Sequence, residues 1–527
     1  MGARPSSFTK EAPAAVTISH VGPQPTNWSE EQNDIFQWFK HLGRCRCRAK
    51  ICLCGPNHLV VRARAGTGKT TTIIEGVNRA PETSILLCAF NKQIAQELNA
   101  RLNNPHAEAK TLHAVGMQAI QRQWPRIRVD AYKRADWLTD KVVPFDTPRP
   151  IRRLVSELHS KGRTMCPLDV TVAKLEVLAL RFDLVPDDGW ERWLLKFVVS
   201  RALAAMTYAK DHAPDYAVGI DFDDMIYLPL VWNLLSKDYQ LVVGDEVQDF
   251  TLAQLEILER ICCGRLCLVG DDKQAIYGFR GADSSSLDRL KKKLNAEELG
   301  LKTTYRCGQA IVREAQLLVP DIQAAAKNPE GQVADTNYGS MLATVQPGDF
   351  ILSRLNAPLV FCTLQLLQQG KRAQMKGRDI GAGIIRIVKG LKVLDDTPMD
   401  VLLTKLQAWE SKMVTRFAAY GQPELADRAR DQAAMIFAFA EESNTCGHLK
   451  ARIEQMFSDG EDATYVWCSS VHKAKGLESD RVFVMRESFC RYGESPEEQN
   501  ILYVAVTRAK SYLFRVYGVP TLQRRRA

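Results

Sequence analysis

The stretch "VVRARAGTGKTTTII", residues 60–74, joins an apolar run to a helical pattern through a loop of small residues. Backbone N–H groups of such a loop, together with the dipole of the following helix, cradle phosphates. Lys69 would reach the β- and γ-phosphates and the Thr70 hydroxyl would hold Mg²⁺, although the strict motif has Gly where this chain has Ala63. The residues expected to bind nucleotide here are Ala65, Gly66, Thr67, Gly68, Lys69, Thr70 and Thr71.

A second apolar run ends in an acidic pair. In "LVVGDEVQD", residues 241–249, Asp245 and Glu246 directly follow the apolar residues. Asp245 would ligand Mg²⁺, and Glu246 would act as general base on the attacking water. An acidic residue can instead cap the next helix, and Asp249 before Thr251 fits that simpler role.

A third apolar run, "LCLVGD" at 266–271, continues into "DKQAIYGFRGAD" at 272–283. Gln274 can point at the γ-phosphate or its attacking water. Tyr277, Phe279 and Arg280 follow at once, and aromatic rings stack on nucleic-acid bases for about 1–3 kcal/mol each. The loop would therefore join a phosphate sensor to a platform for bases. The alternative is that both aromatic rings are ordinary core residues.

Short apolar runs alternate with helical patterns along the chain, which is typical of an α/β protein with parallel sheets. Two sets of apolar runs predict two sheet domains, and two mainly helical stretches predict insertions into them. The expected divisions are a disordered segment at 1–26, a first sheet domain at 27–112 and 221–300, a helical insertion at 113–220, a second sheet domain at 301–388 and 463–527, and a reduced helical insertion at 389–462.

Composition is that of a soluble globular protein, because 46% of the 527 residues are hydrophobic and 25% are charged. No apolar run approaches the ~18 residues of a membrane span. The absence of a secretory signal and the scatter of Cys through apolar strands favour the cytoplasm. A net charge of +9 suits a polyanionic partner without requiring one.

Six motifs together resemble those of the UvrD/Rep-like superfamily 1 DNA helicases, in the same order. They are "ARAGTGKT" (63–70), "DEVQD" (245–249), "VGDDKQAIYGFRGAD" (269–283), "TTYRCG" (303–308), "SSVHKAKGLESDRVFV" (469–484) and "EEQNILYVAVTRAK" (497–510). The resemblance implies two RecA-like P-loop NTPase domains with ATP between them and single-stranded DNA across their tops. It also implies an ATP- and Mg²⁺-dependent monomeric helicase that moves 3′-to-5′ and acts on single-stranded DNA and its junctions with duplex.

Further nucleotide contacts follow from the resemblance alone. Tyr305 would stack on the adenine base, and Glu478 would contact the sugar. Arg306 and Arg508 would reach across to the γ-phosphate, where a second domain supplying cations makes hydrolysis depend on closure.

Gln32 in "NWSEEQ" resembles the glutamine that reads adenine in this family. Ser29-x-x-Gln32 is also a capping box, which needs no nucleotide, so both interpretations stay open.

The residues that would contact DNA are likewise transferred from the resemblance. Besides Tyr277, Phe279 and Arg280 they are Phe90, Asn91, Thr111, His113 and His472. A lone His is often a structural residue, so only the surrounding motifs favour the two histidines.

"CRCRAKICLC", residues 45–54, departs from the family pattern. Its four thiols could bind Zn²⁺, but the spacing is unusual for zinc, and a basic hairpin without metal is the alternative. The residues concerned are Cys45, Cys47, Cys52 and Cys54.

The interval between Arg306 and His472 is shorter than in full-length relatives of the resembled family. A reduced second insertion puts unaided unwinding in doubt more than translocation. The alternative function is therefore a DNA-stimulated ATPase that serves as a subunit of a larger complex with a protein partner. A plain DNA-binding protein would not need Lys69 and Glu246.

Overall fold

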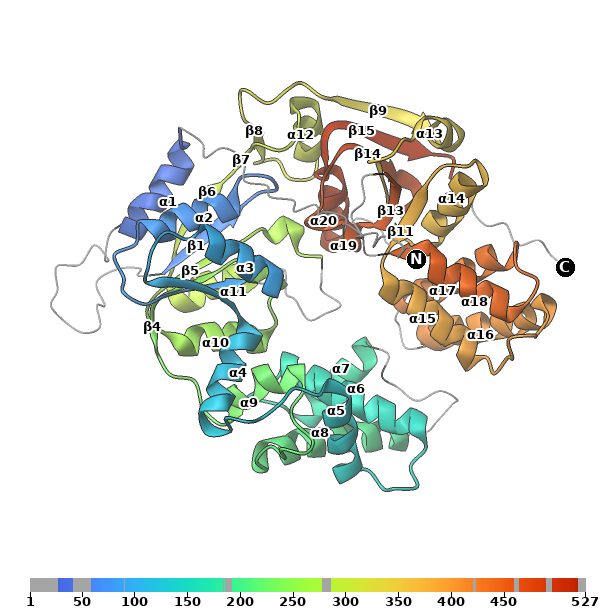
Figure 1. Ribbon diagram of the computed structural model, residues 1–527, viewed down its shortest axis with the longest axis horizontal. Helices are drawn as coiled ribbons and strands as arrows, with labels where there is room; N and C mark the ends of the chain where they lie inside the picture. Colours follow the sequence, from blue (N-terminus) through green and yellow to red (C-terminus); the bar gives the residue numbers. More distant parts are fainter. Residues whose placement is uncertain are drawn as a thin grey trace, which may run out of the picture.

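The computed structural model describes residues 27–40, 58–89, 91–182, 184, 192–276, 286–419, 423–458, 464–489 and 495–519. Its strands fall into two large parallel sheets, each covered by helices, so the expected α/β fold class is confirmed (Figure 1).

The first sheet has six parallel strands in the order β3-β2-β4-β5-β1-β6. Strand β2 is buried along its whole length, as expected for a parallel strand covered on both faces. The strands are β1 Leu59–Ala63, β2 Ile85–Ala89, β3 Ala107–Thr111, β4 Tyr239–Gly244, β5 Cys262–Gly270 and β6 Glu297–Leu301.

Helices cover both faces of this sheet and form a separate apolar cluster on each. One cluster holds Ile35 and Ile73, and the other holds Ile257 and Leu287. The helices are α1 Glu30–Lys40, α2 Lys69–Asn78, α3 Lys92–Arg101, α10 Leu252–Ile261 and α11 Ser286–Leu294, with a short 3₁₀ turn η1 Val247–Asp249 after β4 and another, η2 Asp272–Gln274, after β5.

Between β3 and β4 the chain forms a helical unit with its own apolar core (lower part of Figure 1). Arg163 lies inside this unit and pairs with Asp221 at 2.8 Å and Asp224 at 2.7 Å. The helices are α4 Leu112–Gln123, α5 Ala131–Val142, α6 Arg149–Met165, α7 Val172–Arg181, α8 Arg192–Asp211 and α9 Phe222–Val231.

The second sheet has seven parallel strands in the order β12-β11-β13-β10-β14-β15-β9. They are β9 Gln332–Asn337, β10 Phe350–Ser353, β11 Ala373–Lys376, β12 Phe457–Ser458, β13 Val466–Ser470, β14 Ser479–Met485 and β15 Ala509–Tyr517. A two-stranded sheet, β7 Thr303–Thr304 with β8 Gln323–Ala324, precedes them. The accompanying helices are α12 Gln309–Gln316, α13 Tyr338–Thr344, α14 Ala357–Gln368, α15 Arg378–Gly390, α19 Val471–Ala474 and α20 Pro496–Val506, with a 3₁₀ turn η4 Arg486–Ser488.

Three further helices, α16 Met399–Ala419, α17 Pro423–Ala440 and α18 Cys446–Met456, occupy the stretch expected for the reduced insertion. Leu402 of α16, Ile436 of α17 and Leu449 of α18 belong to one apolar cluster that also contains Ile351 and Met375 of the second sheet. Strand β12, inside the range 389–462, pairs with β11 of the same sheet. These helices therefore pack as part of the second sheet domain.

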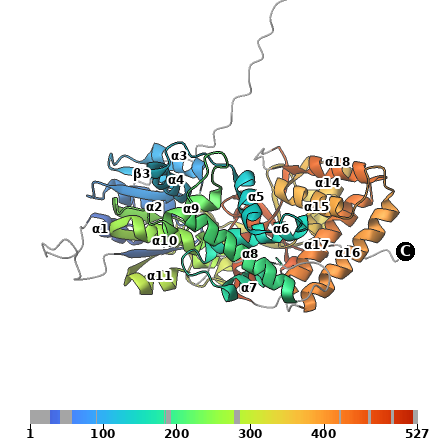
Figure 2. The same cartoon turned by 90° about the horizontal axis from the view of Figure 1, so that it is seen from below.

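The two sheet domains touch through loops that follow strands of the first sheet. Ala65 and Ile276 from the first domain join an apolar cluster with Cys307, Tyr503 and Val504 of the second. Figure 2 gives the same arrangement from below, with the first sheet and its helices at one side and α14–α18 at the other. The phosphate loop therefore lies against the second domain.

Candidate functional site

The phosphate loop has the strand, loop and helix that the sequence predicts. Strand β1 ends at Ala63 and helix α2 begins at Lys69. Gly66 and Gly68 have φ values of +72° and +77°, a left-handed conformation that favours glycine. Thr67 is buried, and its hydroxyl donates to the Arg64 carbonyl at 2.9 Å. The loop backbone is therefore bent as a phosphate cradle requires.

The acidic pair lies next to this loop because β4, β5 and β1 are consecutive in the sheet. Lys69 Nζ is 2.8 Å from Glu246 Oε1. The Thr70 hydroxyl donates to Asp245 Oδ2 at 3.3 Å. Two oxygen donors at this separation fit neighbouring ligands of Mg²⁺, which binds oxygen at about 2.0–2.1 Å in an octahedron.

The two carboxylates differ in pKa. For Glu246, burial opposes ionisation, but Lys69 and Lys475 outweigh it and lower the pKa to about 2. For Asp245, burial and the neighbouring Glu246 charge raise the pKa to about 6. Glu246 is therefore ionised at neutral pH, while Asp245 is placed where a cation would favour its ionised form.

Gln274 follows β5 and is connected to the acidic pair by a chain of hydrogen bonds. Its Nε2 donates to Asp271 Oδ2 at 2.7 Å, and the Asp271 N–H donates to Gln248 Oε1 at 3.0 Å. Gln248 Nε2 in turn donates to Glu246 Oε2 at 2.5 Å. The structure thus brings Gln274 into one network with Glu246, with its side chain directed at Asp271.

Residues from the second domain contact the phosphate loop at Gly66. The Tyr305 N–H donates to the Gly66 carbonyl at 2.9 Å. A Cβ added at Gly66 would lie 2.6 Å from both Arg306 Cβ and Thr304 Oγ1, so only glycine fits this approach. Tyr305 is 42% exposed.

The two arginines expected at the γ-phosphate have partners within the second domain. Arg306 Nε is 2.6 Å from Glu478 Oε2, and Lys510 Nζ is 2.9 Å from Glu478 Oε1. Arg508 is 1% exposed and donates to the carbonyls of Val504 and Leu477, each at 3.0 Å. Burial and the nearby Arg306 lower the Arg508 pKa to about 10.

Gln32 forms the capping box and also contacts the phosphate loop helix. The Ser29 N–H donates to Gln32 Oε1 at 3.0 Å, and the Gln32 N–H donates to Ser29 Oγ at 3.2 Å. Gln32 Nε2 donates to Thr72 Oγ1 at 3.0 Å. The capping role is therefore present, and a role in reading adenine stays a prediction.

The expected DNA-contacting residues within the described parts of the chain lie near strand ends of both sheets. Asn91 and Thr111 are helix N-caps, accepting from the N–H groups of Ile94 at 2.8 Å and Ala114 at 3.1 Å. His113 lies edge-on to the exposed ring of Phe222, and burial lowers its pKa. His472 is in α19, directly after β13.

Some predicted residues lie outside the described residues. They are Phe90, Tyr277, Phe279, Arg280, Cys45, Cys47, Cys52 and Cys54. Within the described ranges, His, Cys, Asp and Glu form no cluster of three or more suited to a metal ion.

Sequence reasoning missed several residues that connect the domains. Lys475 Nζ lies 2.7 Å from Asp249 Oδ2 and donates to the Gln274 carbonyl at 2.8 Å. The Ala65 N–H donates to the Tyr503 hydroxyl oxygen at 3.1 Å. Both Lys475 and Tyr503 stand inside motifs noted in the sequence, but the motif alone does not say which side chain crosses to the other domain.

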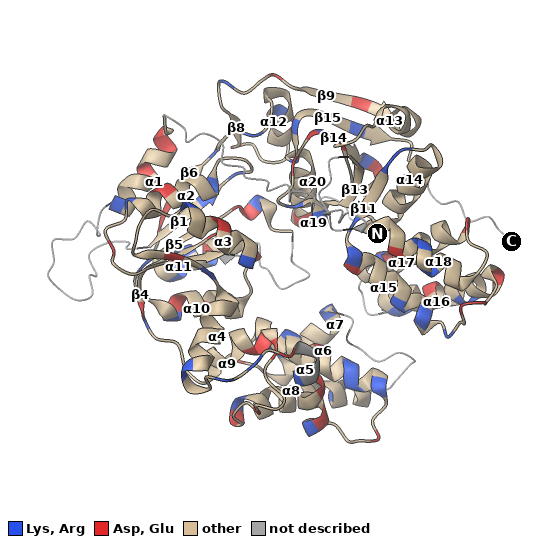
Figure 3. Ribbon diagram, in the orientation of Figure 1, with Lys and Arg blue, Asp and Glu red and all other residues tan. Residues whose placement is uncertain are grey.

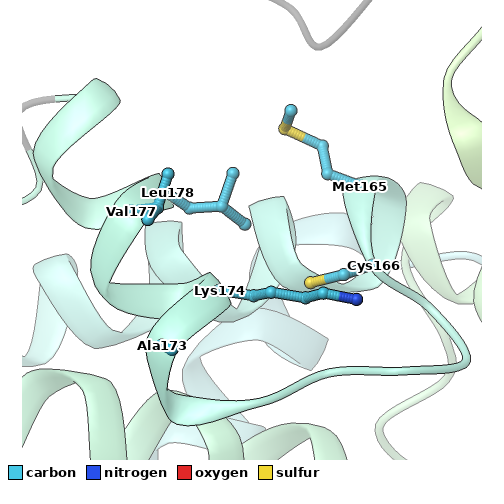
Figure 4. A pocket seen from close by; sticks show the side chains of 6 residues that line it. All are labelled: Met165, Cys166, Ala173, Lys174, Val177 and Leu178. Atoms are coloured by element: carbon cyan, nitrogen blue, oxygen red, sulfur yellow. The ribbon is translucent and has the colours of Figure 1, made fainter.

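Figure 3 shows acidic and basic residues on the ribbons of both sheet domains and of the helical unit between β3 and β4. An apolar pocket lies in that helical unit (Figure 4). The side chains that line it are Met165, Cys166, Ala173, Lys174, Val177 and Leu178. None of them belongs to the predicted site.

Two parallel-sheet domains that meet at a phosphate loop beside an acidic pair define a P-loop NTPase fold with two sheet domains. The comparisons with known proteins give the family. Residues 47–295 match the UvrD/REP helicase N-terminal domain, and residues 465–516 match the UvrD-like helicase C-terminal domain. Together these ranges span more than half of the chain, which belongs to the UvrD/Rep-like family of ATP-dependent DNA helicases.

Similar proteins include helicases from fungi, bacteria and animals. F-box DNA helicase protein 1 of Schizosaccharomyces pombe is 25% identical over 511 residues, covering 88% of this chain and 56% of that protein. F-box DNA helicase 1 of Gallus gallus is 24% identical, covering 86% of this chain and 46% of that protein. ATP-dependent DNA helicase UvrD2 of Mycobacterium bovis is 23% identical, covering 86% of this chain and 75% of that protein. The chain thus spans about half the length of the two F-box relatives.

Every helix in the described ranges is too short or too polar to cross a membrane.

Proposed function

We propose that this chain is an ATP- and Mg²⁺-dependent DNA helicase and translocase that moves 3′-to-5′ on single-stranded DNA and couples hydrolysis to strand separation. The observation that supports it best is the convergence of both domains on the phosphate loop. The Tyr305 N–H donates to the Gly66 carbonyl, and the Tyr503 hydroxyl accepts from the Ala65 N–H. A translocase must couple ATP hydrolysis to domain movement, and contacts of both domains with the phosphate loop would provide that coupling.

Within the first domain, the loop backbone and Lys69 would bind the phosphates. Thr70 and Asp245 would hold Mg²⁺, which neutralises phosphate charge when bound. Glu246 would accept the proton of the attacking water, for which its ionised state at neutral pH is required. Gln274 would orient that water after exchanging its hydrogen bond to Asp271.

From the second domain, Tyr305 would stack on adenine and Glu478 would contact the sugar. Arg306 and Arg508 would stabilise charge on the γ-phosphate. Arg306 is paired with Glu478 and Arg508 with backbone carbonyls, so both would exchange partners as the domains move. That exchange would make hydrolysis depend on domain position.

The track would be single-stranded DNA crossing both domains, with single-strand to duplex junctions as substrates. We propose that the protein acts as a monomer in the cytoplasm. The residues proposed to contact DNA are Phe90, Asn91, Thr111, His113, Tyr277, Phe279, Arg280 and His472.

A zinc site at residues 45–54 stays a separate proposal. Metal analysis of protein purified without chelators tests it directly. Stoichiometric zinc that is lost on replacing Cys45 and Cys52 by Ser would support it, and protein free of zinc and iron would contradict it.

The alternative function, a DNA-stimulated ATPase subunit of a larger complex that unwinds little alone, is favoured by one observation. Helices α16, α17 and α18 share the apolar core of the second sheet. Helices buried in that way present less independent surface for engaging duplex DNA, so a partner protein would have to supply it.

Unwinding assays separate these two functions. Duplexes that carry either a 3′ or a 5′ single-stranded tail are incubated with the purified chain, ATP and Mg²⁺, with a Lys69→Ala variant as the control for contaminating activity. Strand separation from the 3′ tail supports the self-sufficient helicase. ATP hydrolysis with translocation but no strand separation supports the subunit, and separation from the 5′ tail alone contradicts the proposed polarity.

A further inference from the structure

Arg64, inside the phosphate loop, has a buried side chain that engages three carboxylates. Its Nε and Nη2 donate to the two oxygens of Asp321, at 2.8 and 2.9 Å. Its Nη1 donates to Asp271 at 2.9 Å and to Asp272 at 2.8 Å. The Arg64 residue is only 5% exposed, so these bonds replace the water that its guanidinium would otherwise bind.

The three carboxylates come from different domains. Asp271 and Asp272 directly follow β5 of the first sheet. Asp321 precedes β8, and its neighbours Val319 and Ile322 are buried in the apolar cluster of the second domain. Arg64 therefore spans the domain boundary through one rigid, planar group.

Two neighbouring residues make cross-domain contacts as well. The Ala65 N–H donates to the Tyr503 hydroxyl at 3.1 Å, and the Gly66 carbonyl accepts from the Tyr305 N–H at 2.9 Å. Three consecutive loop residues thus contact the second domain. Of the three contacts, only the one from Arg64 is made by an ionised side chain.

The Arg64 contacts continue to the groups expected to act on ATP. Asp271 accepts from Gln274 and donates its N–H to Gln248, which donates to Glu246, and Glu246 pairs with Lys69. One continuous network therefore runs from Asp321 in the second domain to the acidic pair in the first.

We propose that Arg64 is a positioning residue that couples the placement of the second domain to the phosphate loop and the acidic pair. The inference rests on the proposed ATPase function. Movement that removes Asp321 leaves a buried guanidinium without its bidentate partner, which is costly, so the loop and the Asp271 network rearrange with the domain. Lys keeps the charge but lacks the planar fork that makes the bidentate contact.

A double-mutant cycle tests the proposal with Arg64→Lys, Asp321→Asn and the two combined. Asp321 has a side chain that is 38% exposed, so Asp321→Asn should fold even if a change at Arg64 does not. Asp335→Asn is the matched control, because Asp335 is in the same domain and its ion pair with Arg515 is at the surface. For each variant, ATP affinity is measured with a fluorescent ATP analogue, and kcat for hydrolysis is measured with and without single-stranded DNA.

We expect Asp321→Asn and Arg64→Lys each to lower DNA-stimulated kcat by at least about fivefold, the lower range of measured coupling between sites. ATP affinity should change by less than about threefold, because Lys69 and the loop glycines Gly66 and Gly68 are not substituted. The double variant should be no worse than the more affected single variant. Asp335→Asn should behave as the unchanged chain does.

Other results would contradict the proposed coupling or the proposed function. An Asp321→Asn variant with unchanged DNA-stimulated kcat contradicts the coupling, as do additive effects in the double variant or an equal loss of ATP affinity. An unchanged chain whose hydrolysis does not respond to DNA contradicts the proposed function itself. The two failures are therefore separated by the behaviour of the unchanged chain.

Discussion

At the scale of single residues, Glu246 combines an unusual backbone with a strong electrostatic environment. Its φ of +53° is rare for a residue with a side chain, and such strain occurs most often at functional sites. Lys69 and Lys475 keep its carboxylate ionised. Backbone and charge together direct one carboxylate oxygen to Lys69 and the other to Gln248.

Glu246→Gln should keep ATP binding and remove turnover, because the amide cannot accept the proton of the attacking water while the phosphate loop is unaltered. We expect kcat to fall by at least about 10²-fold, as for other general bases. Steady-state hydrolysis and binding of a fluorescent ATP analogue measure the two effects. Glu256→Gln, which alters an ion pair on α10, is the control. Turnover near that of the unchanged chain would remove Glu246 from the mechanism.

Protonation of His159 should make the stability of the helical unit between β3 and β4 depend on pH. It is fully buried among Arg163 and Asp221, both ring nitrogens lack a hydrogen-bond partner in the described structure, and burial lowers its pKa to about 3. The unfolded chain therefore binds this proton at higher pH than the folded chain. Stability from neutral His159 is complete above the unfolded pKa of about 6.5 and is lost as the pH falls toward 3.

His159→Leu should remove that acid sensitivity. A proton bound only in the unfolded state changes the free energy of unfolding by about 1.4 kcal/mol per pH unit well below the unfolded pKa. Integrated from pH 7.5 to 5.5 across a pKa of about 6.5, the variant should gain about 1.4 kcal/mol in free energy of unfolding relative to the unchanged chain. Thermal unfolding at both pH values measures the difference, with His212→Gln as an exposed control. A difference between variant and unchanged chain that is the same at both pH values would contradict the assignment.

At the scale of elements, loops after parallel strands carry the site, and their positions follow from the sheet. Strands β2, β4, β5 and β1 are adjacent in that order, so the residues that follow them meet at one edge. This part could be predicted from sequence, because apolar run, loop chemistry and helical pattern coincide at residues 60–74 and 241–249. The contacts of Arg64 and Tyr503 could not, because their partners are hundreds of residues away.

The loop after β5 should couple hydrolysis to movement through Phe279, if that ring stacks on bases. Phe279→Ala is expected to slow translocation per ATP hydrolysed more than it weakens ATP binding, since stacking contributes about 1–3 kcal/mol per base. Translocation rate, hydrolysis rate and ATP affinity are measured on one preparation. Equal loss of all three would indicate a core role for Phe279 instead.

Helices α16–α18 illustrate a limit of sequence patterns. Their periodicity predicts helices with an apolar face, but it does not say which surface that face packs against. The structure buries those faces on the second sheet through Leu402, Leu406 and Leu449. The expected reduced insertion is thus present as helices, but it shares a core with the domain into which it is inserted.

Leu406→Ala should therefore destabilise the whole second sheet domain and not only helices α16–α18. We expect a loss of about 2–5 kcal/mol in the free energy of unfolding, the range for a fully buried Leu. Leu394→Ala is the matched control, because Leu394 is 74% exposed. Denaturant unfolding measures the free energy of unfolding. Amide hydrogen exchange in β10 and β11 of the native protein then shows whether the loss of stability reaches the second sheet. Exchange in those strands that does not change would contradict the shared core.

At the scale of the whole molecule, two sheet domains meet at one phosphate loop. The apolar contact of Ala65 and Ile276 with the second domain is joined by the polar contacts of Arg64 and Lys475. Family membership and fold agree with the expectation from sequence. Arg306 and Arg508 contact Glu478 and backbone carbonyls of their own domain, and their expected contacts with the γ-phosphate stay a prediction.

The most direct measurement is the rate of ATP hydrolysis by the purified chain, with and without single-stranded DNA, in the presence of Mg²⁺. If DNA binding repositions the two domains at the phosphate loop, DNA should raise kcat well above the basal rate, and Lys69→Ala should abolish both rates. A basal rate that DNA leaves unchanged would contradict the account, because the two domains would then meet at the phosphate loop without coupling the track to hydrolysis.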